Sequence, residues 1–174
     1  VATVEDLVAQ MRGRFLALAA AHSLTAPAAP VVDAAISEKR RLRGLLEAIL
    51  EPFKGSLPVE LAVEEVLVGR AAVTPLALVF YELCTNAVKY GALSGNTGRL
   101  AISSERRGDR LILHWDETSA PIQASPVVQG QGFGTLMCEM ALQDQLDGSF
   151  QRQFTNSGMR ASLDLSFARL SADL

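Results

Sequence analysis

The spacing of apolar residues divides the first third of the chain into two helical segments. Apolar residues such as Met11 and Phe15 recur at three- to four-residue intervals, which predicts an amphipathic helix over residues 3–24. A linker with two prolines three residues apart ends this helix. A second helical pattern begins at Ser37, a suitable N-cap, and ends near Pro52. Its basic residues are assigned to a solvated face: Lys39, Arg40, Arg41 and Arg43.

Beyond this second helix the apolar period changes to two, as in strands. Alternating valines and leucines predict two short strands within 59–68, flanking a turn. Further strands are predicted over 99–104 and 111–116, joined by a glycine-containing hairpin turn. A last hairpin is predicted from the strands over 149–154 and 159–167. Between the strand over 111–116 and this last hairpin, glycine-rich sequence opens another helix, whose apolar positions are predicted to include Leu136, Met140 and Leu146.

The most informative segment is the predicted helix over 74–94. Thr74 followed by Pro75 is typical of a helix start, with a hydroxyl cap and proline at the first helical position. Beside its apolar face, three different polar groups follow one another at helical spacing: Glu82, Asn86 and Lys89. Because asparagine is a mediocre helix former, this order indicates a ligand-facing edge, and a solvated helix edge is the alternative.

Composition limits the fold and the partners. A chain of 174 residues with 49% apolar residues fits one α+β domain over 31–174, preceded by a helix and linker over 1–30. A net charge of −3 without a basic stripe argues against a nucleic-acid partner. No signal peptide or membrane-length apolar run is apparent, so we expect a cytoplasmic protein without a membrane segment. Cys84 and Cys138 fall in helical patterns, which favours packed, reduced thiols.

Two further places carry candidate chemistry. Trp115-Asp116-Glu117 delivers a carboxylate at the end of a strand. The glycine-rich loop over 129–135 runs into a helix, so its backbone N–H groups can approach an oxyanion closely. With the polar stripe of the 74–94 helix, these features supply the parts of a magnesium–nucleotide site, without a Walker A pattern.

These motifs resemble a known family. Residues 82–94, ELCTNAVKYGALS, resemble the N-box of bacterial sensor histidine kinases, which have the Bergerat ATP-binding fold shared with gyrase-type ATPases. The KYGALS ending and Trp115-x-Glu117 resemble in particular the HWE-type subfamily. The similarity runs from about residue 12 to 167. It implies a Bergerat-type two-layer sandwich, with a mixed, mostly antiparallel sheet covered by helices on one face and an N-terminal helix before it.

The resemblance also implies roles for the matching residues. Asn86 would coordinate Mg²⁺ that bridges the phosphates, and Glu82 would orient or polarise the attacking group. Lys89 would contact phosphate, and Tyr90 would pack near the base. Glu117 would accept the adenine amino group in place of the family's usual aspartate. The second glycine box would hold the phosphate tail: Gly132, Phe133, Gly134 and Thr135.

The function implied is the ATP-binding catalytic domain of a two-component histidine kinase, which transfers the γ-phosphoryl group to a histidine outside this chain. A response regulator and a homodimer through the N-terminal helical region are the expected partners. His22 continues an apolar helix stripe and His114 lies in a strand, so neither is expected to accept the phosphoryl group. The family's acceptor helix is missing, which is typical of a fragment or a truncated relative.

Two departures from the family pattern keep an alternative open. Tyr81 replaces the histidine that precedes the N-box glutamate, and Ser119-Ala120 replaces paired glycines after Glu117. The side chains of Ser119 and Ala120 would crowd a nucleotide where the backbone should approach it closely. The alternative function is a phosphorelay or scaffold module with a degenerate nucleotide site that docks a response regulator.

Overall fold

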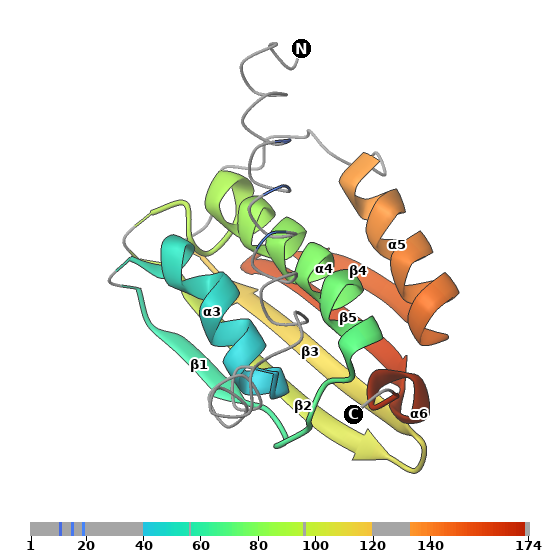
Figure 1. The fold of residues 1–174 in the computed structure, drawn as a ribbon. Coiled ribbons are helices and arrows are strands. Elements are labelled where there is room, and N and C mark those ends of the chain that lie inside the picture. Colours follow the sequence, from blue (N-terminus) through green and yellow to red (C-terminus); the bar gives the residue numbers. More distant parts are fainter. Residues whose placement is uncertain are drawn as a thin grey trace.

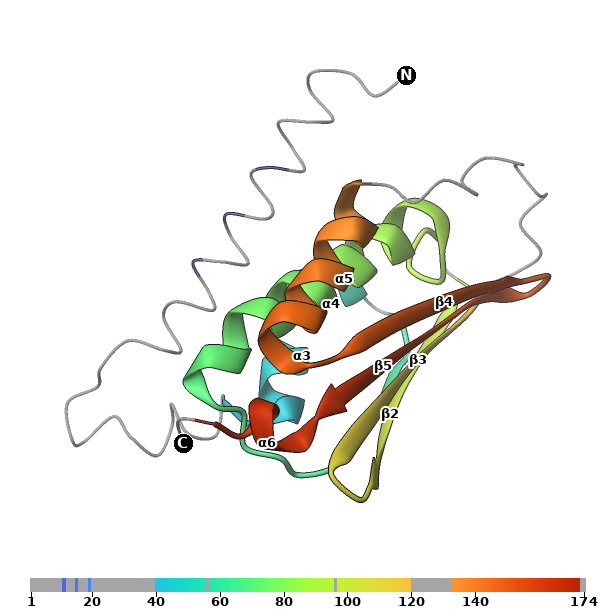
Figure 2. The same cartoon turned by 90° about the vertical axis from the view of Figure 1, so that its right-hand side faces the viewer.

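A five-stranded sheet with helices on one of its faces forms the described part of the chain in the computed structural model (Figures 1 and 2). The strands are β1 (Val59–Ala62), β2 (Arg99–Arg107), β3 (Arg110–Thr118), β4 (Ser149–Thr155) and β5 (Gly158–Ser166). The helices are α3 (Leu42–Lys54), α4 (Arg70–Tyr90), α5 (Phe133–Leu146) and the short α6 (Phe167–Leu170). This arrangement confirms the predicted α+β sandwich.

The structure describes residues 40–55, 57–95, 97–119 and 133–172, together with Met11, Phe15 and Ala19. These three residues are helical and exposed, in agreement with the predicted first helix. The rest of that helix, the linker, His22 and Ser37 lie outside the described residues, and so does most of the glycine-rich loop.

The sheet is built from two hairpins and one parallel strand. The strand order is β1-β2-β3-β5-β4, in which β2–β3, β3–β5 and β4–β5 pair antiparallel and β1 pairs parallel with β2. The predicted hairpin turn at Gly108 is confirmed, with a φ of 62° that glycine adopts without strain. The register aligns Trp115 with Ala161 and Ala161 with Arg152 across three neighbouring strands.

The core lies between the sheet and the helices. Period-two alternation puts Leu111, Leu113 and Trp115 of β3 on the buried face. Over them packs α4, whose buried residues include Val79, Phe80, Leu83 and Ala87. By length and composition α4 could also cross a membrane, but 56% of its most apolar window is buried inside the domain, as in the core helix of a globular protein.

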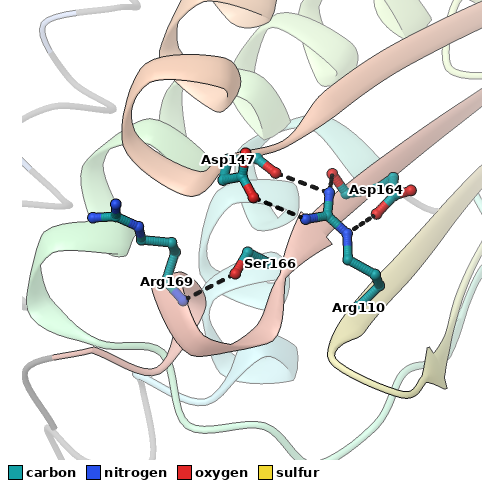
Figure 3. A network of polar contacts seen from close by, with 5 residues as sticks. All are labelled: Arg110, Asp147, Asp164, Ser166 and Arg169. Atoms are coloured by element: carbon teal, nitrogen blue, oxygen red, sulfur yellow. Dashed lines mark hydrogen bonds and ion pairs between the residues drawn. The ribbon is translucent and has the colours of Figure 1, made fainter.

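A polar network closes one end of the sheet (Figure 3). The Arg110 guanidinium donates to the Asp164 carboxylate at 2.6 Å and to the Asp147 backbone carbonyl at 2.8 Å. Asp147 follows α5 and has a φ of 45°, a backbone conformation that few side chains adopt. Arg110 therefore fastens the turn between α5 and β4 to β3 and β5. Ser166 caps α6 beside this network, accepting from the Arg169 backbone N–H at 3.4 Å.

Several predicted boundaries are wrong. α4 begins at Arg70, four residues before the predicted start, so that Pro75 lies inside the helix and removes one backbone donor there. α3 likewise continues through Pro52 and ends at Lys54. Of the two strands predicted within 59–68, only β1 forms, and the residues that follow it make an isolated bridge from Leu67 to Arg41.

Two predictions about exposure also fail. Arg40, assigned to a solvated face, is only 7% exposed, and its guanidinium donates to the Val68 carbonyl at 3.2 Å. On α5, Leu136 and Met140 are exposed, and the buried positions are Cys138, Leu142 and Leu146. The helix has little separation of apolar and polar residues, so periodicity alone does not indicate its buried side.

Candidate functional site

The polar stripe of α4 meets α5 and β4 at a small hollow. Glu82 and Asn86 lie one helical turn apart and are both half-buried. They line the hollow together with Leu83, Thr135, Cys138, Phe150 and Arg152. Its volume is about 10 Å³, close to the least that one water molecule needs. The structure therefore brings together the predicted catalytic carboxylate, the predicted magnesium ligand and one residue of the predicted glycine box.

The other predicted residues of α4 lie beyond this hollow. Lys89 and Tyr90 belong to the last turn of the helix and are exposed, Tyr90 by 60%. They follow Asn86 by three and four residues, and so they lie on its side of the helix, nearer the C-terminal end. Phosphate or base contacts by these two residues stay a prediction.

Glu117 at the end of β3 is buried and hydrogen-bonded. Its Oε1 accepts from the Trp115 indole N–H at 2.8 Å, and its Oε2 accepts from the Ala92 backbone N–H at 2.9 Å. Burial raises the pKa of the Glu117 carboxyl above its usual value, while these hydrogen bonds and the charge of Arg152 act in the opposite direction. Glu117 thus links β3 to the residues that follow α4, and each oxygen keeps one further lone pair for a ligand.

The glycine box is described only in part. Gly132 lies outside the described residues, and so does the side chain of Phe133, the first residue of α5. Gly134 and Thr135 belong to the first turn of α5, and Thr135 lines the hollow beside Asn86. The N-terminal turn of a helix of this length is a favourable place for an anion, because its free N–H groups and dipole attract negative charge.

Arg152 also lines this hollow, although none of the sequence motifs includes it. It lies on β4 between the exposed residues Gln151 and Gln153, and it shares the sheet's inner face with Phe150. The alternation of the β4 residues could have indicated this position, because a charged residue at an inward-facing place in a strand is unusual.

The oxygen donors of this site suit a hard cation in combination with phosphate. Mg²⁺ in nucleotide sites takes one or two protein oxygens and completes its coordination with phosphates and water. The Asn86 amide and the Glu82 carboxylate supply such oxygens at the hollow. No group of three or more His, Cys, Asp or Glu side chains that could hold a metal occurs among the described residues. The residues therefore fit a cation that arrives with a nucleotide.

A larger depression lies elsewhere, between α3 and β1. It has a volume of about 460 Å³, and its polar lining comes from Arg43, Glu47, Glu51 and Lys54. These four groups form ion pairs with one another, Arg43 with Glu47 and Lys54 with Glu51. None of the predicted site residues lines it, so its size alone does not make it the functional site.

The sequence is related to bacterial histidine kinases. No family model matches it. It is 31% identical over 168 residues to blue-light-activated histidine kinase 1 of Erythrobacter litoralis, covering 93% of this chain and 44% of that protein. It is 36% identical over 98 residues to a blue-light-activated histidine kinase of Rhizobium johnstonii, covering 55% of this chain and 28% of that protein. The chain spans less than half the length of these curated relatives.

Solved structures share the fold. The histidine kinase domain of a blue-light-activated histidine kinase from Erythrobacter litoralis matches with a TM-score of 0.64 at 14% identity, covering 94% of this chain and 79% of that one. The catalytic domain of histidine kinase ThkA matches with a TM-score of 0.55 at 18% identity, covering 72% of this chain and 93% of that one.

The fold is therefore that of a histidine kinase catalytic domain, and the predicted Bergerat-type sandwich is confirmed. With the sequence identity to the blue-light-activated kinases, it identifies the chain as the C-terminal catalytic domain of an HWE-type sensor histidine kinase.

Proposed function

We propose that this domain binds ATP with Mg²⁺ and transfers the γ-phosphoryl group to a histidine outside the chain. The observation that carries the proposal is the meeting of Glu82, Asn86 and Thr135 at one hollow between α4 and α5. Phosphoryl transfer asks a protein mainly to position the reactants and to neutralise charge, and these side chains have the chemistry for both tasks.

Each residue of the site then has a role. Asn86 holds the cation, which offsets the charge of the phosphates when it is bound. Glu82 orients the attacking imidazole, whose nitrogen forms the new bond to phosphorus as the bond to the ADP oxygen breaks. A free lone pair of the Glu117 carboxylate accepts a hydrogen bond from the adenine amino group, and Tyr90 packs near the base. The remaining residues bind the phosphate tail of the nucleotide: Lys89, Gly132, Phe133, Gly134 and Thr135.

The position of His114 supports an acceptor histidine outside the chain. His114 lies on the β3 face opposite Trp115, with its Nε2 3.5 Å from a Glu105 carboxylate oxygen. Because it points away from the face that carries α4 and α5, it does not lie in line with a phosphate bound there.

The partners of the whole protein belong to the same proposal. ThkA has been solved in complex with a response regulator protein. We infer that the present protein also passes its phosphoryl group to a response regulator, works as a homodimer through its N-terminal helical region, and resides in the cytoplasm.

Calorimetric titration with Mg-ATP tests the proposed function. We expect saturable binding, with an affinity at least tenfold lower in Asn86→Ala and unchanged in Asn156→Ala, a control at the exposed turn between β4 and β5. Both variants should unfold at the urea concentration of the wild type. Competition by GTP should be weaker than by ATP, because guanine has a carbonyl oxygen at C6 where adenine has its amino group, and this oxygen would leave two acceptors facing each other.

Absence of Mg-ATP binding in the folded wild type would contradict the proposal. It would favour the alternative, a module that docks a response regulator without using a nucleotide. The internal hydrogen bonds of Glu117 and the narrowness of the hollow would then explain why the nucleotide does not bind.

A further inference from the structure

Arg152 places a positive charge under the helix layer, where the proposed nucleotide site lies. Its strand, β4, is an edge strand, and its register puts Arg152 in one row with Ala161 and Trp115 on the inner face of the sheet. The side chain is half-buried and lines the hollow beside Asn86 and Thr135. Arg152 therefore shares the hollow with the first turn of α5 and the polar edge of α4.

The contacts of Arg152 differ from those of the comparable arginines. Among the described residues, four arginines have side chains that are buried or half-buried: Arg40, Arg43, Arg110 and Arg152. The first three donate hydrogen bonds, to the Val68 carbonyl, the Leu61 carbonyl and the Asp164 carboxylate respectively.

Arg152 meets no acceptor within hydrogen-bond or ion-pair distance in the described part of the chain. Its guanidinium carbon lies 5.0 Å from the centre of the Phe154 ring, and its charge also acts on the Glu117 carboxylate. A guanidinium has five N–H donors, and on a half-buried side chain without an acceptor among the described residues they can donate to a bound anion. This arrangement therefore points to an anion that completes the site.

We propose that Arg152 binds the phosphate tail of the nucleotide, together with Asn86 and Thr135. The inference rests on the proposed function and adds to it a phosphate-binding residue from β4, outside the N-box and the glycine box. The planar fork of arginine can bind two phosphate oxygens at once. The first turn of α5 contributes its dipole on the other side of the same hollow.

Affinity measurements on a series of adenine compounds test this role. The compounds are adenosine, Mg-ADP and Mg-ATP, and the proteins are the wild type, Arg152→Met, Arg152→Lys and Arg160→Met. Arg160 is the matched control, because it lies on the neighbouring strand, faces outward with its side chain 73% exposed, and pairs with Asp116.

The loss of affinity should grow with the number of phosphates. We expect Arg152→Met to weaken Mg-ATP binding by about tenfold or more, Mg-ADP less, and adenosine not at all. Arg152→Lys should retain an intermediate affinity for Mg-ATP, because it keeps the charge but not the fork. Arg160→Met should equal the wild type with all three compounds.

Equal losses for adenosine and Mg-ATP would overturn the inference, since they would place the effect of Arg152 on Glu117 or on the fold. Unchanged Mg-ATP affinity in Arg152→Met would also overturn it. If urea unfolding shows that Arg152→Met does not fold, the comparison passes to Arg152→Lys, where the same graded loss is required.

A tripolyphosphate titration separates this inference from the proposed function. Binding of tripolyphosphate that is lost in Arg152→Met, in a protein that does not bind ATP, would support the anion site and contradict the kinase proposal. A wild type that binds neither compound contradicts both. If the wild type binds both compounds and Arg152→Met binds both equally well, the result contradicts only the role of Arg152.

Discussion

The substitution Gly91→Ala should damage the connection between α4 and β3. Gly91 directly follows α4 with a φ of −124° and a ψ of −150°, an extended conformation that alanine can also adopt. Its effect is therefore steric. An added Cβ would lie 1.8 Å from Oε2 of Glu117 and 3.0 Å from the Ala87 Cα, so the carboxylate has to withdraw by about 1 Å or more.

The cost follows from what holds that carboxylate. A side-chain end usually moves aside cheaply, but Glu117 is 5% exposed, and its oxygens accept from Ala92 and Trp115. Withdrawal by about 1 Å stretches the 2.9 Å bond from the Ala92 N–H beyond hydrogen-bond distance. Hydrogen bonds to charged groups contribute about 1.5–3 kcal/mol, so losing this bond and straining the other should lower the free energy of unfolding by about 2–5 kcal/mol.

Urea denaturation, followed by circular dichroism, measures this loss, with Gly95→Ala as its matched control. Gly95 lies in the same loop, and a Cβ there meets nothing within 4 Å. We expect Gly95→Ala to remain within about 0.5 kcal/mol of the wild type. In a double-mutant cycle, Glu117→Ala should relieve part of the clash, so that the two losses do not add. Equal stability of Gly91→Ala and Gly95→Ala, or simple additivity with Glu117→Ala, would refute the steric argument.

Three further predictions concern charge and burial. Arg110→Met should lower the free energy of unfolding, measured by urea denaturation, by about 1.5–3 kcal/mol, because it leaves Asp164 without its donor. The control Arg107→Met, at an exposed position, should change it by less than about 0.5 kcal/mol. Burial raises the folded-state pKa of Glu117, so its contribution to stability is present below about pH 4.5 and is lost as the pH rises through the raised pKa. The wild type should therefore lose stability relative to Glu117→Gln over that pH range. A gain in stability relative to Glu117→Gln would contradict the raised pKa. Burial also raises the pKa of the Cys84 thiol, so peptide mapping by mass spectrometry should find iodoacetamide on Cys84 at pH 8 only as fast as the domain opens, and labelling at the rate of a free thiol would contradict this.

Local patterns sufficed to predict most of the sheet. The strands with clear period-two alternation, such as β3 with Leu111, Leu113 and Trp115, form where the sequence predicts them. Glu82 and Asn86 of the polar stripe line the same hollow, because helical spacing fixes which side chains share a side.

The errors come from tertiary packing that overrides local signals. Local sequence predicts helix boundaries at Pro52 and Pro75, yet buried apolar neighbours hold both helices together around them. Arg40 looked solvated, because no local pattern indicates that the distant Val68 carbonyl needs a donor. No motif indicates Arg152 for a similar reason, since its neighbours on α4 and α5 come from other parts of the sequence.

The joining of the two hairpins has a consequence for the order of folding. β2–β3 and β4–β5 each pair across a two-residue turn, and hairpins of this kind form within about 1–10 μs. The pairing of β3 with β5 instead joins residues about 50 positions apart, such as Trp115 and Ala161, with the whole of α5 between them. Long-range pairings of this kind slow folding, so the β3–β5 seam should set the rate. Because Arg110 and Asp164 meet across this seam, substitutions there should show in refolding kinetics, whereas substitutions at the tip of either hairpin should mainly change the unfolding rate.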